Sequence, residues 1–77
     1  MDIDRMQRLQ YQINDFNGIA LKRGIKTRLA IQNEVVVIGS EAQLSYGNYQ
    51  CVIEGDYLQV LCAVRTMIKM LCFEFGE

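Results

Sequence analysis

The residues with the clearest chemical potential are four cations packed into the seven-residue segment KRGIKTR. Lys22, Arg23, Lys26 and Arg28 are half of the eight Lys and Arg residues in the chain. Such a cluster could contact phosphate groups or an acidic protein partner. No aromatic residue is interleaved with these cations to stack on bases, which argues against nucleic acid. We favour a solvated turn and strand face as the interpretation of this candidate basic patch.

Groups that usually carry catalysis are scarce in the sequence. There is no histidine, which removes the commonest general base. The three cysteines Cys51, Cys62 and Cys72 form no CxxC pair, and we interpret them as small buried hydrophobic residues. The carboxylates that could form an acid and base pair fall at expected turns and strand ends: Asp15, Glu34, Glu41, Glu54, Asp56 and Glu74. We therefore expect no enzymatic activity, no metal and no cofactor.

Length and composition predict one small domain over residues 1–77. Hydrophobic residues make up 51% of the chain and charged residues 22%, which is typical of a globular protein. A chain this short buries a modest fraction of its surface, so we expect a protein partner or self-association, including a homo-oligomer. The polar N-terminal segment and the absence of a run of ~20 apolar residues predict a cytoplasmic protein that meets membranes only through a partner.

The segment AQLSYGNYQCVI predicts a β-hairpin. Gly47-Asn48 is a dipeptide that favours two-residue hairpin loops, because both residues tolerate positive φ. With that loop, the apolar side chains before and after it share one face of the sheet. We interpret this face as core beneath a C-terminal helix. If the face is uncovered, it becomes a candidate interface formed by Leu44, Tyr46, Tyr49, Cys51 and Ile53.

Alternation upstream of this hairpin predicts further strands. In IKTRLAIQ, apolar residues and Thr27 alternate with Lys26, Arg28, Ala30 and Gln32. VVVI at 35–38 predicts a strand that is apolar on both faces and therefore central or covered. GIALKRGI suggests a short strand with a turn near Arg23-Gly24. These segments together predict an antiparallel meander.

The two ends of the chain fit both helix and strand. Five apolar residues recur at helical spacing in the N-terminal segment, Ile3, Met6, Leu9, Ile13 and Phe16, yet LQYQIN at 9–14 also alternates. A 4-3-4-3-4 spacing links Tyr57, Leu61, Val64, Ile68, Leu71 and Phe75 at the C-terminal end. Asp56 and Gln59 occupy capping-box positions and Gly76 could end the helix, so we favour a helix over roughly 60–75.

Four segments, INDFNGIAL, RLAI, VVVIGSEAQLSY and CVIEGDYLQVL, together resemble the YabP/YqfC family of bacterial sporulation proteins. The resemblance covers residues 9–61. The positions that match the family pattern are Ile13, Asn14, Asp15, Phe16, Asn17, Gly18, Arg28, Leu29, Gly39 and Gly55. Asn17 stands where the family usually has a basic residue, and residues 62–77 have no counterpart.

The resemblance implies a strand at 9–14 and a β meander over 9–54, followed by a strand or helix tail at 56–77. The expected fold is therefore mostly β, with five to six antiparallel strands and a C-terminal helix. The implied function is a non-enzymatic structural or protein-interaction module in endospore formation.

Two other functions remain open. An α+β fold with an N-terminal helix and an Sm-like five-stranded barrel would predict an RNA-binding ring. A small phage-encoded inhibitor of a host protein is the second alternative.

Overall fold

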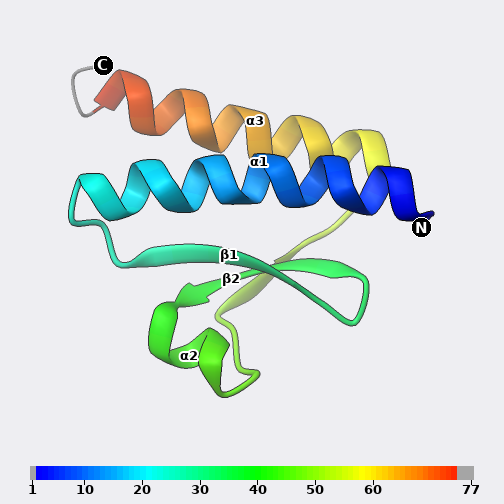
Figure 1. The fold of residues 1–77 in the computed structure, drawn as a ribbon, viewed down its shortest axis with the longest axis horizontal. Coiled ribbons are helices and arrows are strands. Elements are labelled where there is room, and N and C mark those ends of the chain that lie inside the picture. Colours follow the sequence, from blue (N-terminus) through cyan, green and yellow to red (C-terminus); the bar gives the residue numbers. More distant parts are fainter. Residues whose placement is uncertain (1, 75–77) are drawn as a thin grey trace.

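The structure, a computed structural model that describes residues 2–74, combines two long helices with a small sheet (Figure 1). The elements are α1 (Ile3–Lys22), β1 (Thr27–Gln32), β2 (Val35–Ser40), α2 (Glu41–Ser45), β3 (Cys51–Ile53) and α3 (Tyr57–Glu74). The strands form one antiparallel sheet in the order β1-β2-β3. Helices α1 and α3 lie side by side and run in the same direction.

This α+β architecture contradicts the predicted mostly-β meander of five to six strands. Within residues 2–74 there are three strands, too few also for the alternative Sm-like barrel. The N-terminal helix of that alternative is present, but its five-stranded part is wrong. The three consecutive strands do form an antiparallel meander, although it covers residues 27–53 rather than 9–54.

Helix α1 resolves the ambiguity of the N-terminal segment. Asp2 caps the helix, and its carboxylate accepts a hydrogen bond of 2.9 Å from the Arg5 backbone N–H. A strand at 9–14 would place Tyr11 on the same face as Leu9 and Ile13. Instead Tyr11 is 73% exposed, whereas Leu9 and Ile13 are each 1% exposed. The strand implied by the family resemblance is therefore wrong, and the helical spacing is what the fold uses.

The short strand expected in GIALKRGI is also wrong, because most of this segment belongs to α1. The helix continues through Gly18 to Lys22. The predicted turn at Arg23-Gly24 is confirmed, because Arg23 is the C-cap and Gly24 has a φ of 69°. Positive φ is a conformation that glycine adopts readily after a helix end.

The tight hairpin of the sheet lies at Asn33-Glu34, which joins β1 to β2. Both loop residues have positive φ, 51° and 66°, as a two-residue hairpin loop matched to strand twist requires. The register pairs Gln32 with Val35 and continues to the ends of both strands. The predicted alternation of residues 25–32 is confirmed, with Leu29 buried toward the helices.

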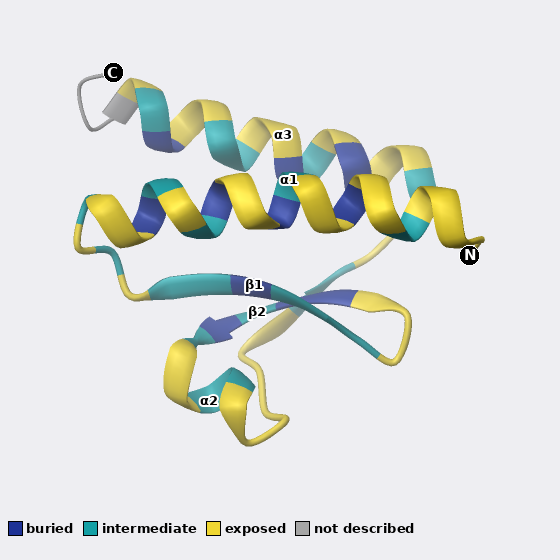
Figure 2. Cartoon of the chain, in the orientation of Figure 1, coloured by how far each residue is buried: buried dark blue, intermediate teal, exposed yellow. Residues whose placement is uncertain are grey.

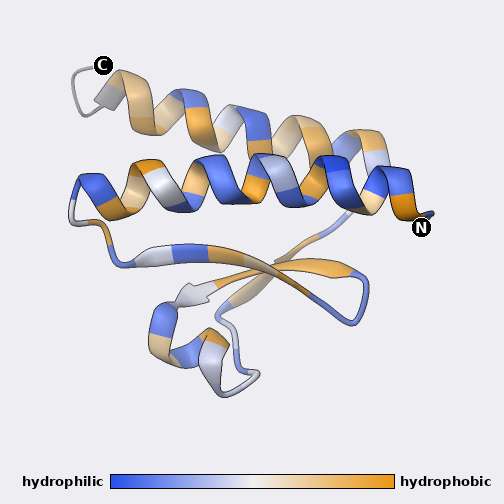
Figure 3. Ribbon diagram, viewed as in Figure 1, coloured by the Kyte–Doolittle hydropathy of each residue, from blue (hydrophilic) through white to orange (hydrophobic). Residues whose placement is uncertain are grey.

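The core fills the space between the helices and one side of the sheet, called here the helix side (Figure 2). Its buried members come from α1, β1, β2 and α3: Leu9, Ile13, Phe16, Ala20, Leu29, Val36, Val60, Leu61, Val64 and Leu71. Hydrophobic residues recur among hydrophilic ones along α1 (Figure 3), as expected for a helix with one buried stripe. In residues 2–74, no helix has both the length and the apolar character needed to span a membrane.

Asn17 fixes α1 to the outer edge of β1. Its side-chain Nδ2 donates to the Leu29 carbonyl over 2.9 Å, and its Oδ1 accepts from the Leu29 N–H over 2.8 Å. The amide therefore occupies the two backbone groups that a further strand would use at this point. This bidentate contact explains why the sheet ends at β1 and does not extend into the N-terminal segment.

Residues 41–45 form helix α2 where a strand of the predicted hairpin was expected. Ser40 begins α2 with a capping box: its Oγ accepts from the Gln43 N–H, and the Gln43 side chain accepts from the Ser40 N–H. Gly47 follows the helix end with a φ of 76°, and the Asn48 N–H donates to the Gln43 carbonyl over 2.8 Å. This is the hydrogen-bond pattern of a helix C-terminus, so Gly47-Asn48 ends a helix instead of turning a hairpin.

Helix α3 confirms the expected C-terminal helix. The Asp56 carboxylate accepts from the Gln59 N–H, and Gln59 Oε1 accepts from the Asp56 N–H, each over 2.9 Å. This capping box starts the helix at Tyr57, three residues before the predicted start. Phe75 and Gly76, which the prediction also used, lie outside the described residues.

Candidate interaction surface

Helix α2 and the loop after it lie over the side of the sheet opposite α1 (Figure 1), called here the α2 side. Val37 is fully buried but does not belong to the core cluster on the helix side. Strand alternation points Val37 to the α2 side, where α2 covers it. The Gln32 side chain donates to the Leu44 carbonyl over 3.4 Å and so links the end of α2 to the hairpin.

Gly39 allows α2 and its loop to approach the sheet closely. A Cβ at this position would lie 3.1 Å from Gln43 Oε1, 3.3 Å from Leu44 Cδ2 and 3.4 Å from the Tyr49 Cα. The missing side chain therefore lets Leu44 and the backbone of Tyr49 rest directly on β2.

Around this small contact, apolar side chains remain exposed. Tyr46 is 84% exposed, Tyr49 is 49% exposed and Val35 is 42% exposed, while Leu44 and Val52 are half-buried. We call these five residues the α2-side patch. Val35 and Val52 belong to the sheet, whereas Leu44, Tyr46 and Tyr49 belong to α2, its end and the loop after it. Exposed aromatic and branched side chains of this kind are typical of a surface that another molecule covers.

The expected interface residues do not share one pleated face. Leu44 belongs to α2 and Tyr46 is its C-cap, whereas Cys51 and Ile53 belong to β3. Ile53 packs against the core on the helix side. The single apolar face predicted from the hairpin, and its interpretation as core, are therefore wrong.

The patch nevertheless retains Leu44, Tyr46 and Tyr49 from the expected interface. It adds Val35 and Val52, which sequence reasoning missed. Val35 could have been found from the predicted strand VVVI, because that segment has apolar residues on both faces. The predicted hairpin places Val52 on the face opposite Cys51 and Ile53, and the observed pairing of Val52 with Val37 places Val52 on the α2 side.

Acidic residues flank the α2-side patch. Glu34 precedes Val35 in the hairpin loop, Glu41 begins α2, and Glu54 follows Val52 by two positions at the end of β3. All three side chains are exposed. An apolar surface with an acidic border favours partners that carry apolar and basic groups together.

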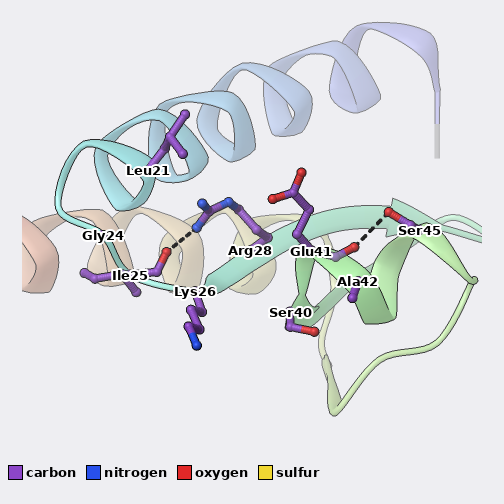
Figure 4. A pocket seen from close by; sticks show the side chains of 9 residues that line it. All are labelled: Leu21, Gly24, Ile25, Lys26, Arg28, Ser40, Glu41, Ala42 and Ser45. Carbon is purple, nitrogen blue, oxygen red and sulfur yellow. Dashed lines mark hydrogen bonds between the residues drawn. The ribbon is translucent and has the colours of Figure 1, made fainter.

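The structure places the four cations of KRGIKTR at the end of α1, in the connection after it and on β1. Lys22 lies in the last turn of α1 and Arg23 is the C-cap, while Lys26 and Arg28 line an open hollow of about 660 Å³ (Figure 4). Leu21, Gly24 and Ile25 form one wall of the hollow. Residues of the β2 end and α2 form the other wall: Ser40, Glu41, Ala42 and Ser45.

Arg28 has a structural role in this hollow. Its Nη1 donates to the Ile25 carbonyl and, over 2.9 Å, to the Thr27 carbonyl. These bonds hold the guanidinium against the start of β1, and the carboxylate of Glu41 brings a negative charge into the same hollow. The hollow therefore has mixed charge, unlike a phosphate site lined by cations alone.

The interpretation of all three cysteines as buried residues is wrong. Cys51 and Cys62 are exposed, and Cys72 is half-buried. Within residues 2–74, no three His, Cys, Asp or Glu side chains are grouped closely enough to hold a metal ion.

Comparison with known proteins returned no match to a family model, to a curated protein or to a solved structure. The resemblance to the sporulation family therefore stays a prediction.

Proposed function

We propose that this chain is a protein-interaction module that binds its partner through the α2-side patch. The observation that carries the proposal is the exposure of Tyr46 and Tyr49, at the end of α2 and in the loop after it, on the side of the sheet that also carries the exposed Val35. A tyrosine combines a large apolar ring with a polar hydroxyl, and few rotatable bonds are ordered when it binds. Such residues supply a large share of binding energy in protein interfaces.

The cellular setting rests on the sequence resemblance alone. We propose a non-enzymatic role in endospore formation, in the cytoplasm of the mother cell. The expected observation is a gene placed beside other sporulation genes in a spore-forming genome. A phage gene neighbourhood would support the alternative of an inhibitor that binds a host protein.

Site-specific photocrosslinking tests the interface directly. A photoreactive phenylalanine analogue would replace Tyr46 in one variant and Tyr11 in a control variant. Both positions are exposed tyrosines, but Tyr11 lies on α1, away from the patch. We expect a discrete crosslinked product in the native host from position 46 and none from position 11.

A second pair of variants separates binding from folding. Tyr46→Ser with Tyr49→Ser should remove the complex that the crosslink identifies, while Tyr11→Ser should keep it. Both proteins should retain the circular dichroism of the wild type, because exposed substitutions change stability little. Equal crosslinking from positions 46 and 11 would contradict the proposal.

A further inference from the structure

Helix α3 carries a second uncovered apolar surface. Its outward residues include Leu58, Met70 and Phe73, which are 67%, 52% and 87% exposed. Cys62 and Lys69 are exposed between them, and the polar residues Gln59 and Thr66 are exposed on the same side of the helix. On a helical projection five of these residues, Leu58, Cys62, Lys69, Met70 and Phe73, point away from Val60 and Val64, which enter the core. We call these five residues the α3 outer face.

The charge of this face is opposite to that of the α2-side patch. Lys69 lies within the α3 outer face and Arg65 lies at its border, and both are exposed. Residues 57–73 contain no Asp or Glu. The molecule therefore has one apolar surface with basic residues and another bordered by Glu34 and Glu54, while Glu41 shares its hollow with Lys26 and Arg28.

This distribution disfavours symmetric pairing of like surfaces. Two α3 outer faces in contact would bring Lys69 and Arg65 of both copies together. Two α2-side patches in contact would bring their glutamates together. Like charges in an apolar interface cost binding energy, whereas pairing of the two different surfaces places opposite charges across the interface.

The two surfaces also lie on opposite sides of the molecule. Figure 1 shows α3 at one side and α2 at the other, with α1 and the sheet between them. A contact between different surfaces on opposite sides is head-to-tail, and it continues from copy to copy unless rotation closes a ring.

From these observations we infer that the partner of the α2-side patch is the α3 outer face of a second copy, which produces head-to-tail oligomers. This inference rests on the proposed function, because it identifies the partner of the same patch. The basic side chains of α3 meet the glutamates around the patch, and Phe73 or Leu58 packs against its tyrosines.

Charge reversal with complementation tests the inference on purified protein. One variant carries Glu34→Lys and Glu54→Lys, and the other carries Arg65→Glu and Lys69→Glu. Sedimentation equilibrium of the wild type should show a mass that rises with concentration. Each variant alone should associate about tenfold more weakly, because two like-charged surfaces then oppose each other. A one-to-one mixture should regain wild-type association, because opposite charges face each other again.

A control pair, Asp4→Lys with Asp15→Lys, changes net charge by the same amount and sign as the glutamate variant, at exposed positions of α1, and should associate like the wild type. Circular dichroism should show all variants folded, and a variant that unfolds would be replaced by its neutral form, with Gln at each changed position. A wild type that stays monomeric at every concentration would overturn the inference. So would a mixture that associates no better than either variant alone.

The crosslinking experiment separates this inference from the proposed function. If position 46 crosslinks to a different protein, the patch remains an interface and the self-association inference fails. If position 46 crosslinks to residues of α3 in another copy, the result supports both the proposed function and the self-association inference. If position 46 gives no discrete product, the proposed function itself fails.

Discussion

The two sides of the sheet differ in how completely they are covered. On the helix side, Leu29 and Val36 belong to the core that they form with α1 and α3, helices of twenty and eighteen residues, and are each 2% exposed. On the α2 side, a helix of five residues covers Val37 but leaves Val35 and Tyr46 open to solvent. Both sides therefore carry apolar residues, but only one has a complete layer over them.

This difference separates the residues that stabilise the fold from those that are free to bind. Burial against many neighbours gives a side chain its contribution to folding, and an exposed ring contributes little. The helix side should therefore dominate the free energy of unfolding. The α2 side should dominate association, and substitutions on the two sides should have separable effects.

The largest effect is expected for Phe16→Ala on the helix side. Phe16 is 3% exposed in the core, and removal of a buried phenylalanine ring costs about 3–5 kcal/mol. A small domain has little stability to lose, so most of this protein should unfold at room temperature. Urea denaturation followed by circular dichroism measures the change. Tyr11→Ala on the exposed face of the same helix is the control, and a similar loss there would contradict the comparison.

A smaller effect is expected for Val37→Ala, at a fully buried position on the α2 side of the sheet. Loss of two methyl groups should lower the free energy of unfolding by about 2 kcal/mol, from transfer and residual cavity together. The matched control is Val35→Ala on the same strand and the same side, because Val35 is 42% exposed. Equal losses at the two positions would show that the α2 side is covered along its whole length.

Ser40→Ala should have a still smaller effect. It removes the side-chain half of the capping box at α2 and should cost about 1 kcal/mol. Because α2 contacts the sheet over a short length, we expect faster amide hydrogen exchange in residues 41–48 and little change in α1. Ala42→Ser, at an exposed position within α2, is the control. Uniformly faster exchange across the molecule would mean that α2 belongs to the main folding unit.

How far the sequence predicts the fold depends on how local each signal is. The Asp56 and Gln59 pair forms the predicted capping box and starts α3 three residues before the predicted start of the helix. The Ser40 and Gln43 pair has the same physical meaning, but Gly47-Asn48 fits a hairpin loop and so predicts a strand over this segment. Positive φ at Gly47 fits both a hairpin loop and a helix end, so only the residues before it distinguish the two.

Other features depend on contacts distant in sequence. The contact between Asn17 and the Leu29 backbone joins residues twelve positions apart, and no local pattern predicts it. The alternation of LQYQIN fits a strand as well as a helix. The segment is a helix that packs against α3, and a pattern within the segment itself does not contain that contact. For the candidate site, the sequence identified Leu44, Tyr46 and Tyr49 but not their exposure, which depends on how short α2 is.

The central claim is that Tyr46 belongs to a binding surface and not to the core. The most direct measurement is the free energy of unfolding of Tyr46→Glu, obtained by urea denaturation under conditions where the protein is monomeric. Because the side chain is 84% exposed, the new carboxylate stays hydrated, and we expect a change within about 0.5 kcal/mol of the wild type. A loss of about 2 kcal/mol or more would show that the ring is buried and that a charge has been forced into the core.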